Sequence, residues 1–418
     1  MTLGRREFIG TALASLSARA FGRESKPYFG LHSFIEANPK AVFIRRTHVA
    51  DKMDGPAKLR EGLELAREIF LPLDKPGVPV THRIILKPNF TSVRDRSRPA
   101  HANMGTGTDP QFYEGLVLGM KEVGLRNFHW IEANNYPAWN LRGFVDINER
   151  LGVRMNEPEV RPRQLLNGEG VTWSTVPDGV VFKRIPHFAP VNEPDTWLLN
   201  IAKWKAHGMC LTQSVKNEQG LIPLPYVRFC HGWGMVTGVP DYMKPDIHPR
   251  VETVVNSFFE RHGKMGYARW DSKAGLSPIR QEIWAHKTCD HQSVLRTGLS
   301  IIEGIYGRDG DGFGTGNDRL ANIVLFGNDK FRLDVIGLYL AGHEPGNIAL
   351  YRIAKERGLS DTFNPWEIPV FEWQDGRAVP RKLADLPRTP LPTYYLQKPG
   401  EPLYHLVNEP FDYDRHKV

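Results

Sequence analysis

Hydrophobic positions along the chain alternate between helical and strand-like spacing. Residues 57–71 carry apolar side chains on one helical face, residues 84–86 form a short apolar run that Pro88 ends, and residues 109–124 return to helical spacing. A second strand-like run follows at 127–133. Strand, helix and strand at this spacing form a βαβ unit, so the pattern predicts a parallel sheet with right-handed crossovers.

The same alternation recurs in the second half of the chain. Strand-like runs are expected at 195–202, 299–305 and 321–328, and helices at 249–263, 330–342 and 345–358. Residues 152–195 are less regular, and two apolar runs within them suggest an antiparallel hairpin insert. We therefore predict one α/β body over residues 21–360, with a mixed, mostly parallel sheet and flanking helices.

Residues 1–20 have the features of an export signal. Arg5 and Arg6 precede a weakly apolar run, and Ala18-Arg19-Ala20 has the small-x-small form of a cleavage site. The arrangement resembles a twin-arginine (Tat) signal, although Gly4 stands where Ser or Thr is usual. We expect recognition by the Tat export machinery and a location in the bacterial periplasm or outside the cell. No other stretch approaches the run of about 18 apolar residues that a transmembrane helix needs.

Residues 361–418 have a different composition from the body. They contain nine prolines, which a central strand or a long helix does not tolerate. Aromatic side chains such as Trp373 and Tyr395 recur in this segment. We expect an extended, Pro-rich tail that packs on the body.

Charge and cysteine usage narrow the function classes. The 418 residues carry a net charge of +7, without the dense Lys/Arg run that marks a nucleic-acid-binding arm. This excess favours acidic small ligands over cationic ones. The three cysteines, Cys210, Cys230 and Cys289, form no C-x-x-C pair, so the usual signal of an iron–sulfur or structural zinc site is missing.

Basic side chains follow two of the predicted strands. Lys87 and Asn89 come directly after one strand, and Lys203, Lys205 and His207 come directly after another. Ligands of open parallel sheets bind beyond the carboxyl ends of the strands. These residues are therefore expected to meet in one cleft, although each alone is equally consistent with a solvated turn or surface.

The residue types suggest acid–base chemistry on an anion. We predict catalytic roles for His207 as general acid or base, for Lys205, and for Lys216 as a second base or nucleophile. The residues predicted to bind the substrate are Lys87, Asn89, Lys203 and Asn217. Lysine ammonium groups would hold a carboxylate or phosphate as point charges.

Carboxylates near the ends of later strands are candidate ligands of a divalent cation. Asp309, Asp311 and Asp329 are the predicted set, and Glu303 and Asp334 lie nearby in sequence. The glycine-rich stretch 306–318 lacks the P-loop and dinucleotide signatures and the closing Glu of a calcium loop. A flexible acidic loop is the alternative interpretation of this stretch.

Residues 286–291 carry a second group of metal-ligand types. His286, Cys289 and His291 are closely spaced, but no fourth ligand stands out, and the segment is also consistent with an ordinary helix.

Five stretches of the chain resemble the DUF362 family, which is defined by sequence and named for its unknown function. They are "ILKPNF" at 85–90, "GTGTDP" at 105–110, "NIAKWKAHGMCLTQSVKNEQGLIP" at 200–223, "IIEGIYGRDGDG" at 301–312 and "GNDKFRLDVIGLYLAG" at 327–342. The most specific element is K-x-K-x-H, followed nine residues later by K-N-x-x-G. The resemblance implies an α/β fold and groups these residues, but it names no reaction.

Three functions are compatible with these features. The first is an exported enzyme acting on a small anionic substrate, and the second is a non-catalytic periplasmic protein that binds an anionic ligand. The third is a redox enzyme loaded with a cofactor before export, for which the sequence shows no cofactor fingerprint.

Overall fold

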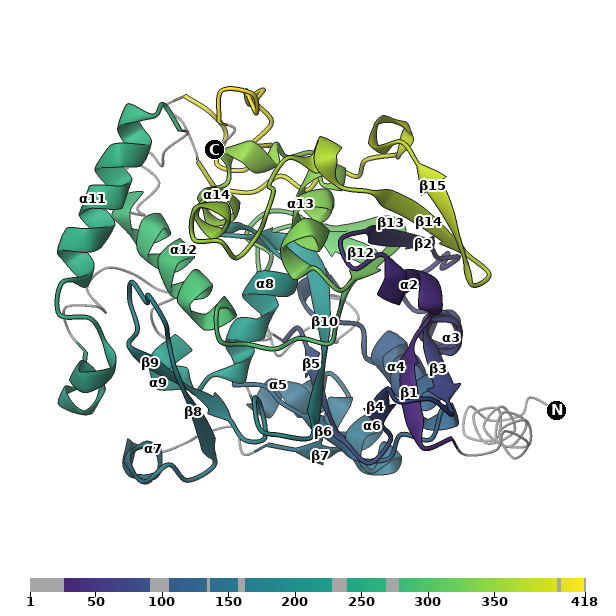
Figure 1. The fold of residues 1–418 in the computed structure, drawn as a ribbon. Helices are drawn as coiled ribbons and strands as arrows, with labels where there is room; N and C mark the ends of the chain where they lie inside the picture. The colour runs from purple at the N-terminus through teal and green to yellow at the C-terminus, as the bar shows by residue number, and fades with distance from the viewer. Residues whose placement is uncertain are drawn as a thin grey trace.

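The central feature of the fold is a large twisted sheet covered by helices on both faces (Figure 1). The computed structural model describes residues 26–90, 105–133, 136–156, 162–227, 239–267, 278–396 and 400–416. The predicted signal at 1–20 lies outside these residues. None of the helices in these ranges is both long and apolar enough to cross a membrane.

The order of the strands in the central sheet is β15-β14-β2-β13-β12-β10-β5-β6-β7, and β11 pairs with the end of β10. Their bounds are β2 (Val42–Arg46), β5 (Arg83–Pro88), β6 (Phe128–Trp130), β7 (Arg154–Met155), β10 (Thr196–His207), β11 (Cys210–Thr212), β12 (Leu299–Arg308), β13 (Asp318–Gly327), β14 (Val370–Gln374) and β15 (Arg377–Arg381). A small sheet of β1 (Tyr28–Leu31), β3 (Phe70–Leu73) and β4 (Val78–Pro79) lies beside it.

Strand directions confirm the predicted mixed, mostly parallel sheet. Neighbours are parallel from β12 through β10, β5 and β6 to β7, and β14 is parallel to β2. Strand β13 runs antiparallel to both β12 and β2. The carboxyl ends of β5, β10 and β12 therefore meet at one edge, whereas β13 ends at the opposite edge.

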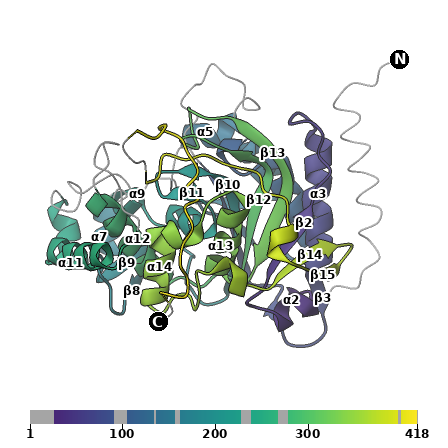
Figure 2. The ribbon, with the colours of Figure 1, turned by 90° about the horizontal axis from the view of Figure 1, so that it is seen from above.

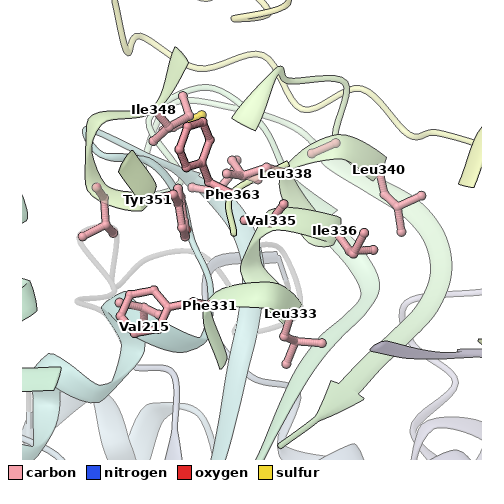
Figure 3. Packing of buried hydrophobic residues seen from close by; sticks show 14 of the residues in the cluster. Val215, Phe331, Leu333, Val335, Ile336, Leu338, Leu340, Ile348, Tyr351 and Phe363 are labelled. Carbon is pink, nitrogen blue, oxygen red and sulfur yellow. The ribbon is translucent and has the colours of Figure 1, made fainter. Parts of the chain in front are cut away.

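The helices form two layers. On one face, α3 (Gly55–Ile69), α4 (Pro110–Glu122) and α6 (Phe144–Leu151) bury apolar side chains together with Ile84, Leu86 and Ile201 of the sheet. On the other face lie α8 (Ser214–Asn217), α12 (Pro278–Gln292), α13 (Lys330–Leu340) and α14 (Ala349–Glu356). Figure 2 shows α3 and α13 on opposite sides of the strands. Buried side chains at α13 are drawn in Figure 3, with Phe331, Val335 and Leu338 near Val215, Ile348 and Tyr351.

The predicted hairpin insert is present as β8 (Val171–Thr175) and β9 (Arg184–Phe188), which pair antiparallel. It packs with α11 (Val251–Lys264) and α12 around a separate apolar cluster that contains Val181, Phe182 and Val255. The remaining short helices are α2 (Ser33–Ala37), α5 (Tyr136–Leu141), α7 (Pro162–Asn167) and α9 (Leu224–Val227).

Strand β10 is longer than the sequence predicts. Its apolar run ends near Ala202, but the strand continues through Lys203 and Lys205 to His207, and every residue from Leu198 onward is buried. The prediction that these three residues follow the strand is therefore wrong. The polar side chains are kept in the strand because partners from distant segments satisfy them.

The C-terminal segment is extended only in part. Its first portion forms the β14–β15 hairpin, which joins the central sheet at β2. The single proline inside β15, Pro380, lies in an edge strand, where a missing N–H donor is tolerated. Beyond β15 the chain is irregular, and Leu391, Tyr395 and other side chains from it are buried in the core beside α13.

Helices α3 and α4 approach each other closely because glycines face the neighbouring backbone. A Cβ atom added at Gly115 would overlap the carbonyl oxygen of Leu59, and one added at Gly62 would overlap that of Phe112. At these two positions the helices touch through backbone atoms, so no flexible side chain can move aside to accommodate a larger residue. It also fixes the position of the loop before α4, which contributes to the site described below.

We expect Gly115→Ala to lower the free energy of unfolding by about 1–3 kcal/mol, because overpacking outweighs the gain in helix propensity. Chemical denaturation measures this change. Gly314→Ala is the matched control, since a Cβ at Gly314 meets no atom within 4 Å. Equal stability of the two variants would show that the α3–α4 contact tolerates extra volume.

Candidate functional site

Lys87 at the end of β5 is neutralised by a buried carboxylate. Its Nζ lies 2.6 Å from Oε2 of Glu132, and both side chains are at most 2% exposed. The ammonium group also donates to the carbonyl oxygen of Pro88. A Cβ at Gly220 would lie 2.6 Å from Cε of Lys87, so the glycine leaves room for the pair. Lys87 therefore has its counter-charge within the protein.

Asn217 connects this ion pair to the neighbouring strand. Its Oδ1 accepts from Nδ2 of Asn89 at 2.9 Å and from Nζ of Lys87 at 3.3 Å, and its Nδ2 donates to Asn200 Oδ1 at 2.7 Å. Asn200 in turn donates to the carbonyl oxygen of Ser214, at the start of α8. The predicted substrate ligands Lys87, Asn89 and Asn217 are thus brought together, but in a network that joins β5 and β10 to α8.

Lys203 has a carboxylate partner of its own on the opposite face of the sheet. Its Nζ lies 2.5 Å from Oε2 of Glu303 on β12, and both side chains are at most 1% exposed. The same Oε2 accepts from the backbone N–H of Asp109, the N-cap residue of α4. Asp109 also pairs with the buried Lys58 of α3 at 2.7 Å. Lys203 therefore ties β10 and β12 to the helices α3 and α4.

Lys205 differs from these lysines because no carboxylate of the described residues forms an ion pair with it. Its side chain is fully buried, and Nζ donates to the carbonyl oxygens of Thr106 at 2.8 Å and Gly312 at 3.2 Å. Nζ also lies 4.3 Å from the ring centroid of Phe313, a cation–π distance. Lys205 is thus a buried ammonium group held by two carbonyl oxygens and an aromatic ring, with no ion-pair partner among the described residues.

The surroundings of Lys205 disfavour its positive charge. Burial lowers its pKa well below the ordinary 10.5, and the positive charges of Lys216 and Arg142 lower the pKa further. Asp311 opposes this shift with a smaller effect. Lys216 lies on α8 and is half-buried, so it is the more accessible cation of the group.

Arg142 is a second buried cation at the same place. Its guanidinium donates to Oγ1 of Thr106, the residue whose carbonyl oxygen accepts from Lys205. Only 6% of the residue is exposed, and Nε has no hydrogen-bond partner in the described structure. Burial lowers the pKa of Arg142 to about 10. Thr106 therefore holds two positive groups side by side.

His207 ends strand β10 between two aromatic rings. Its ring centroid lies 4.9 Å from that of Trp284 and 5.6 Å from that of Phe313. Nδ1 accepts a hydrogen bond from the backbone N–H of Met209 at 3.2 Å. A nitrogen that accepts from an amide carries no proton, so in the neutral imidazole the proton lies on Nε2. His207 therefore presents an N–H donor rather than a general base at Nε2.

The three carboxylates predicted to bind a metal are not brought together. Asp311 accepts from the backbone N–H groups of Phe313 and Thr315, so it stabilises its own loop. Asp309 similarly accepts from Arg319. Asp329 caps α13 at the opposite edge of the sheet, because β13 is antiparallel to β12. The prediction of a shared cation site is wrong for this reason.

The other residues considered as metal ligands are also not arranged to bind a metal. Asp334 accepts from the N–H groups of Ser214 and Val215 and so caps α8, and its burial raises its pKa to about 7. His286 and His291 are fully buried on α12, and burial holds both pKa values well below the usual range. Within the described ranges, no three His, Cys, Asp or Glu side chains form a group that could hold a metal.

Four residues of the site were not identified from the sequence. Glu132 is the second residue after β6, so the strand-end rule that selected Lys87 applies also to it. Asp109 begins a segment of helical spacing, where an aspartate is expected simply as a helix cap. Thr106 lies in the family-like stretch 105–110, but neither this loop threonine nor Arg142, in the turn between α5 and α6, has a residue type that by itself indicates a site.

Comparison with known proteins yields a family assignment alone. The model of the family described as "Domain of unknown function (DUF362)" matches residues 84–339, which contain the whole basic cluster. No curated protein and no solved structure gives a significant match. The match covers more than half of the chain, and we conclude that this protein belongs to the DUF362 family.

Proposed function

We propose that this protein is an enzyme that acts on a small anionic substrate, a carboxylate or a phosphate. The substrate-binding group consists of Lys205, Arg142, His207 and Lys216, which we call the anion cluster. The observation that carries this proposal is the contrast among the buried lysines. Lys58, Lys87 and Lys203 each have a buried carboxylate within 2.7 Å, whereas Lys205 has carbonyl oxygens and an aromatic ring.

The charge balance explains why an anion fits this place. A buried charge without an ion-pair partner costs several kcal/mol, and two cations side by side repel each other. The carboxylates of Asp318 and Asp109 near Arg142, and of Asp311 near Lys205, offset these penalties only in part. A bound anion would remove both penalties for Lys205 and Arg142. The guanidinium is suited to hold two oxygens of a carboxylate or phosphate, and the ammonium binds as a point charge.

Two groups of the cluster are suited to chemistry on the bound anion. The lowered pKa of Lys205 means that Nζ gives up its proton more readily than an ordinary lysine does, which suits a general acid or base. The Nε2–H of His207 can stabilise negative charge that develops on the substrate, as donors of oxyanion holes do. Lys205 thus takes over the acid–base role that the sequence suggested for His207.

A protein that binds an anion without turnover is the second candidate. The observation in its favour is that Lys205 and Arg142 act only as hydrogen-bond donors, and that the Nδ1 of His207 is already occupied. Turnover of small phosphate esters or carboxylates would separate the enzyme from the binding protein, because both candidates share the same anion cluster.

We also propose that the protein is exported through the Tat pathway. The support is the order of features in residues 1–20, where the arginine pair, the apolar run and the cleavage site follow one another. Export in the folded state suits a chain whose site is assembled from distant segments.

We expect Lys205→Met to weaken the binding of inorganic phosphate or acetate by about 10- to 100-fold, because a hydrogen bond to a charged group contributes about 1.5–3 kcal/mol. Isothermal titration calorimetry measures this change. Affinity of the natural protein should also fall as the pH rises, at a pH well below 10.5, because the ammonium form is lost early.

The exposed Lys382 provides the control for this experiment, because Lys382→Met removes the same charge from the surface. Equal losses in both variants would indicate a general effect of net charge and would contradict a specific site at Lys205.

Lys87→Met should lower the free energy of unfolding by about 3–5 kcal/mol, because Glu132 is then left buried and unpaired. The double variant Lys87→Met/Glu132→Leu should recover much of this loss in the same denaturation experiment. A stable Lys87→Met variant that no longer binds anions would instead make Lys87 a substrate ligand.

Replacement of both Arg5 and Arg6 by lysine should abolish export in a bacterium with a Tat pathway, as measured by cell fractionation and immunoblotting. Arg19→Lys serves as the control, since it changes an arginine of the same segment outside the pair. Unchanged periplasmic amounts of the double variant would exclude Tat recognition.

A further inference from the structure

The glycine-rich loop after β12 covers part of the anion cluster. Nζ of the fully buried Lys205 donates to Gly312 O at 3.2 Å and lies 4.3 Å from the ring centroid of Phe313. The centroid of the same ring lies 5.6 Å from that of His207. Phe313 is itself half-buried, and residues 314–315, which follow it, are exposed. Phe313 therefore contacts the buried cation on one side and solvent on the other.

The loop consists of a paired base and a short tip. At the base, the N–H of Asp309 donates to Asn317 O at 3.1 Å, and the N–H of Asn317 donates to Asp309 Oδ1 at 2.5 Å. The tip, residues 310–316, begins and ends at glycines whose φ values are 73° and 136°. Glycine adopts such angles without strain and readily absorbs the backbone rotation of a hinge. The tip can therefore rotate about Gly310 and Gly316 while its base stays paired.

Hydrogen bonds within the tip allow it to move as one unit. Oδ1 of Asp311 accepts from the N–H of Phe313 at 2.6 Å and from that of Thr315 at 3.0 Å. The N–H of Asp311 donates to Thr315 O at 3.0 Å. None of these bonds has to break when the tip rotates. A Cβ atom added at Gly314 would meet no atom within 4 Å, so the outer side of the tip has open space.

Two cations of the body hold the tip in its closed position. Lys205 donates to Gly312 O, and Nε of Arg308 donates to Phe313 O at 2.8 Å. The cation–π contact with the ring of Phe313 adds attraction while Lys205 is protonated. An anion on Lys205 would compete with the carbonyl oxygen and with the ring for the same ammonium group. The contacts that close the loop are thus the ones that a bound anion replaces.

We propose that residues 310–316 form a lid over the anion cluster, with Phe313 as its gate, and that the lid opens to admit an anion to Lys205. Rotation at Gly310 and Gly316 carries the ring of Phe313 away from Lys205 and His207. This inference rests on the proposed function and adds the step that controls access to the site. It also explains how a fully buried lysine receives a ligand from solution.

The test measures how fast acetic anhydride acetylates individual lysines of the full-length protein, with mass spectrometry as the readout. Lys205 should react far more slowly than the exposed Lys382, because it reacts only from the open state. Phe313→Ala should raise the rate at Lys205 by about 10-fold or more, since loss of the packed ring favours the open state. Lys87 and Lys203, which are buried in ion pairs, should keep their rates.

Three controls separate access from other effects. Phe371→Ala removes a half-buried ring that packs against Phe34 and Phe43 instead of the lid, so the rate at Lys205 should not change. Phe313→Leu keeps much of the apolar contact and should have a smaller effect than Phe313→Ala. Rates measured over a range of pH distinguish access from basicity, because a changed pKa of Lys205 shifts the midpoint of the profile, whereas changed access alters its plateau.

The outcomes separate this inference from the proposed function. Equal rates at Lys205 in the natural protein and Phe313→Ala, an equal rise at Lys203, or an equal rise in Phe371→Ala would overturn the lid and leave the anion site in place. Inorganic phosphate should slow the acetylation of Lys205 in the natural protein. If Phe313→Ala acts as expected but phosphate gives no protection, the anion site at Lys205 is overturned and the loop remains only a cover of that side chain.

Discussion

An ammonium group that leaves water loses several kcal/mol of hydration, and β5 and β10 together bury three of them near one edge of a sheet. For Lys203 the protein supplies a carboxylate from the neighbouring strand β12, and for Lys87 it supplies Glu132 from just beyond β6, so each ion pair also ties neighbouring parts of the sheet together. For Lys205 it supplies carbonyl dipoles from loops that precede α4 and follow β12. The arrangement of the surrounding loops follows from the need to satisfy these groups.

The two kinds of lysine have different consequences. A lysine paired with a buried carboxylate has little remaining electrostatic potential, and its main effect is to fix geometry. A protonated lysine that is held only by neutral groups retains most of its positive electrostatic potential and so attracts an opposite charge. In the proposed function, Lys203 supports the structure and Lys205 binds the ligand, although only one residue lies between them on the same strand.

Much of the fold could be predicted from the sequence, because its apolar runs are short, regular and separated by recognisable helix caps such as Asp109. Strand direction was harder to predict, since an apolar run has no polarity. The short connection between Arg308 and Asp318 nevertheless excludes a parallel crossover, which needs a dozen or more residues, and this signal places Asp329 at the other edge. The site was predictable only in part. Lys87, Lys203 and Lys205 look alike in sequence, and their difference depends on Glu132, Glu303 and Thr106, which are distant in the chain.

The pairing of β14 with β2 joins residues 370–374 to residues 42–46. The other neighbour of strand β2 is β13, whose residues are 318–327. During synthesis, the first strands of the central sheet therefore have no neighbours on this side until most of the polypeptide has emerged from the ribosome. Contacts of such long sequence separation slow folding. This chain acquires its tertiary structure late, and until then its β2 edge is exposed to chaperones and to other unfinished chains.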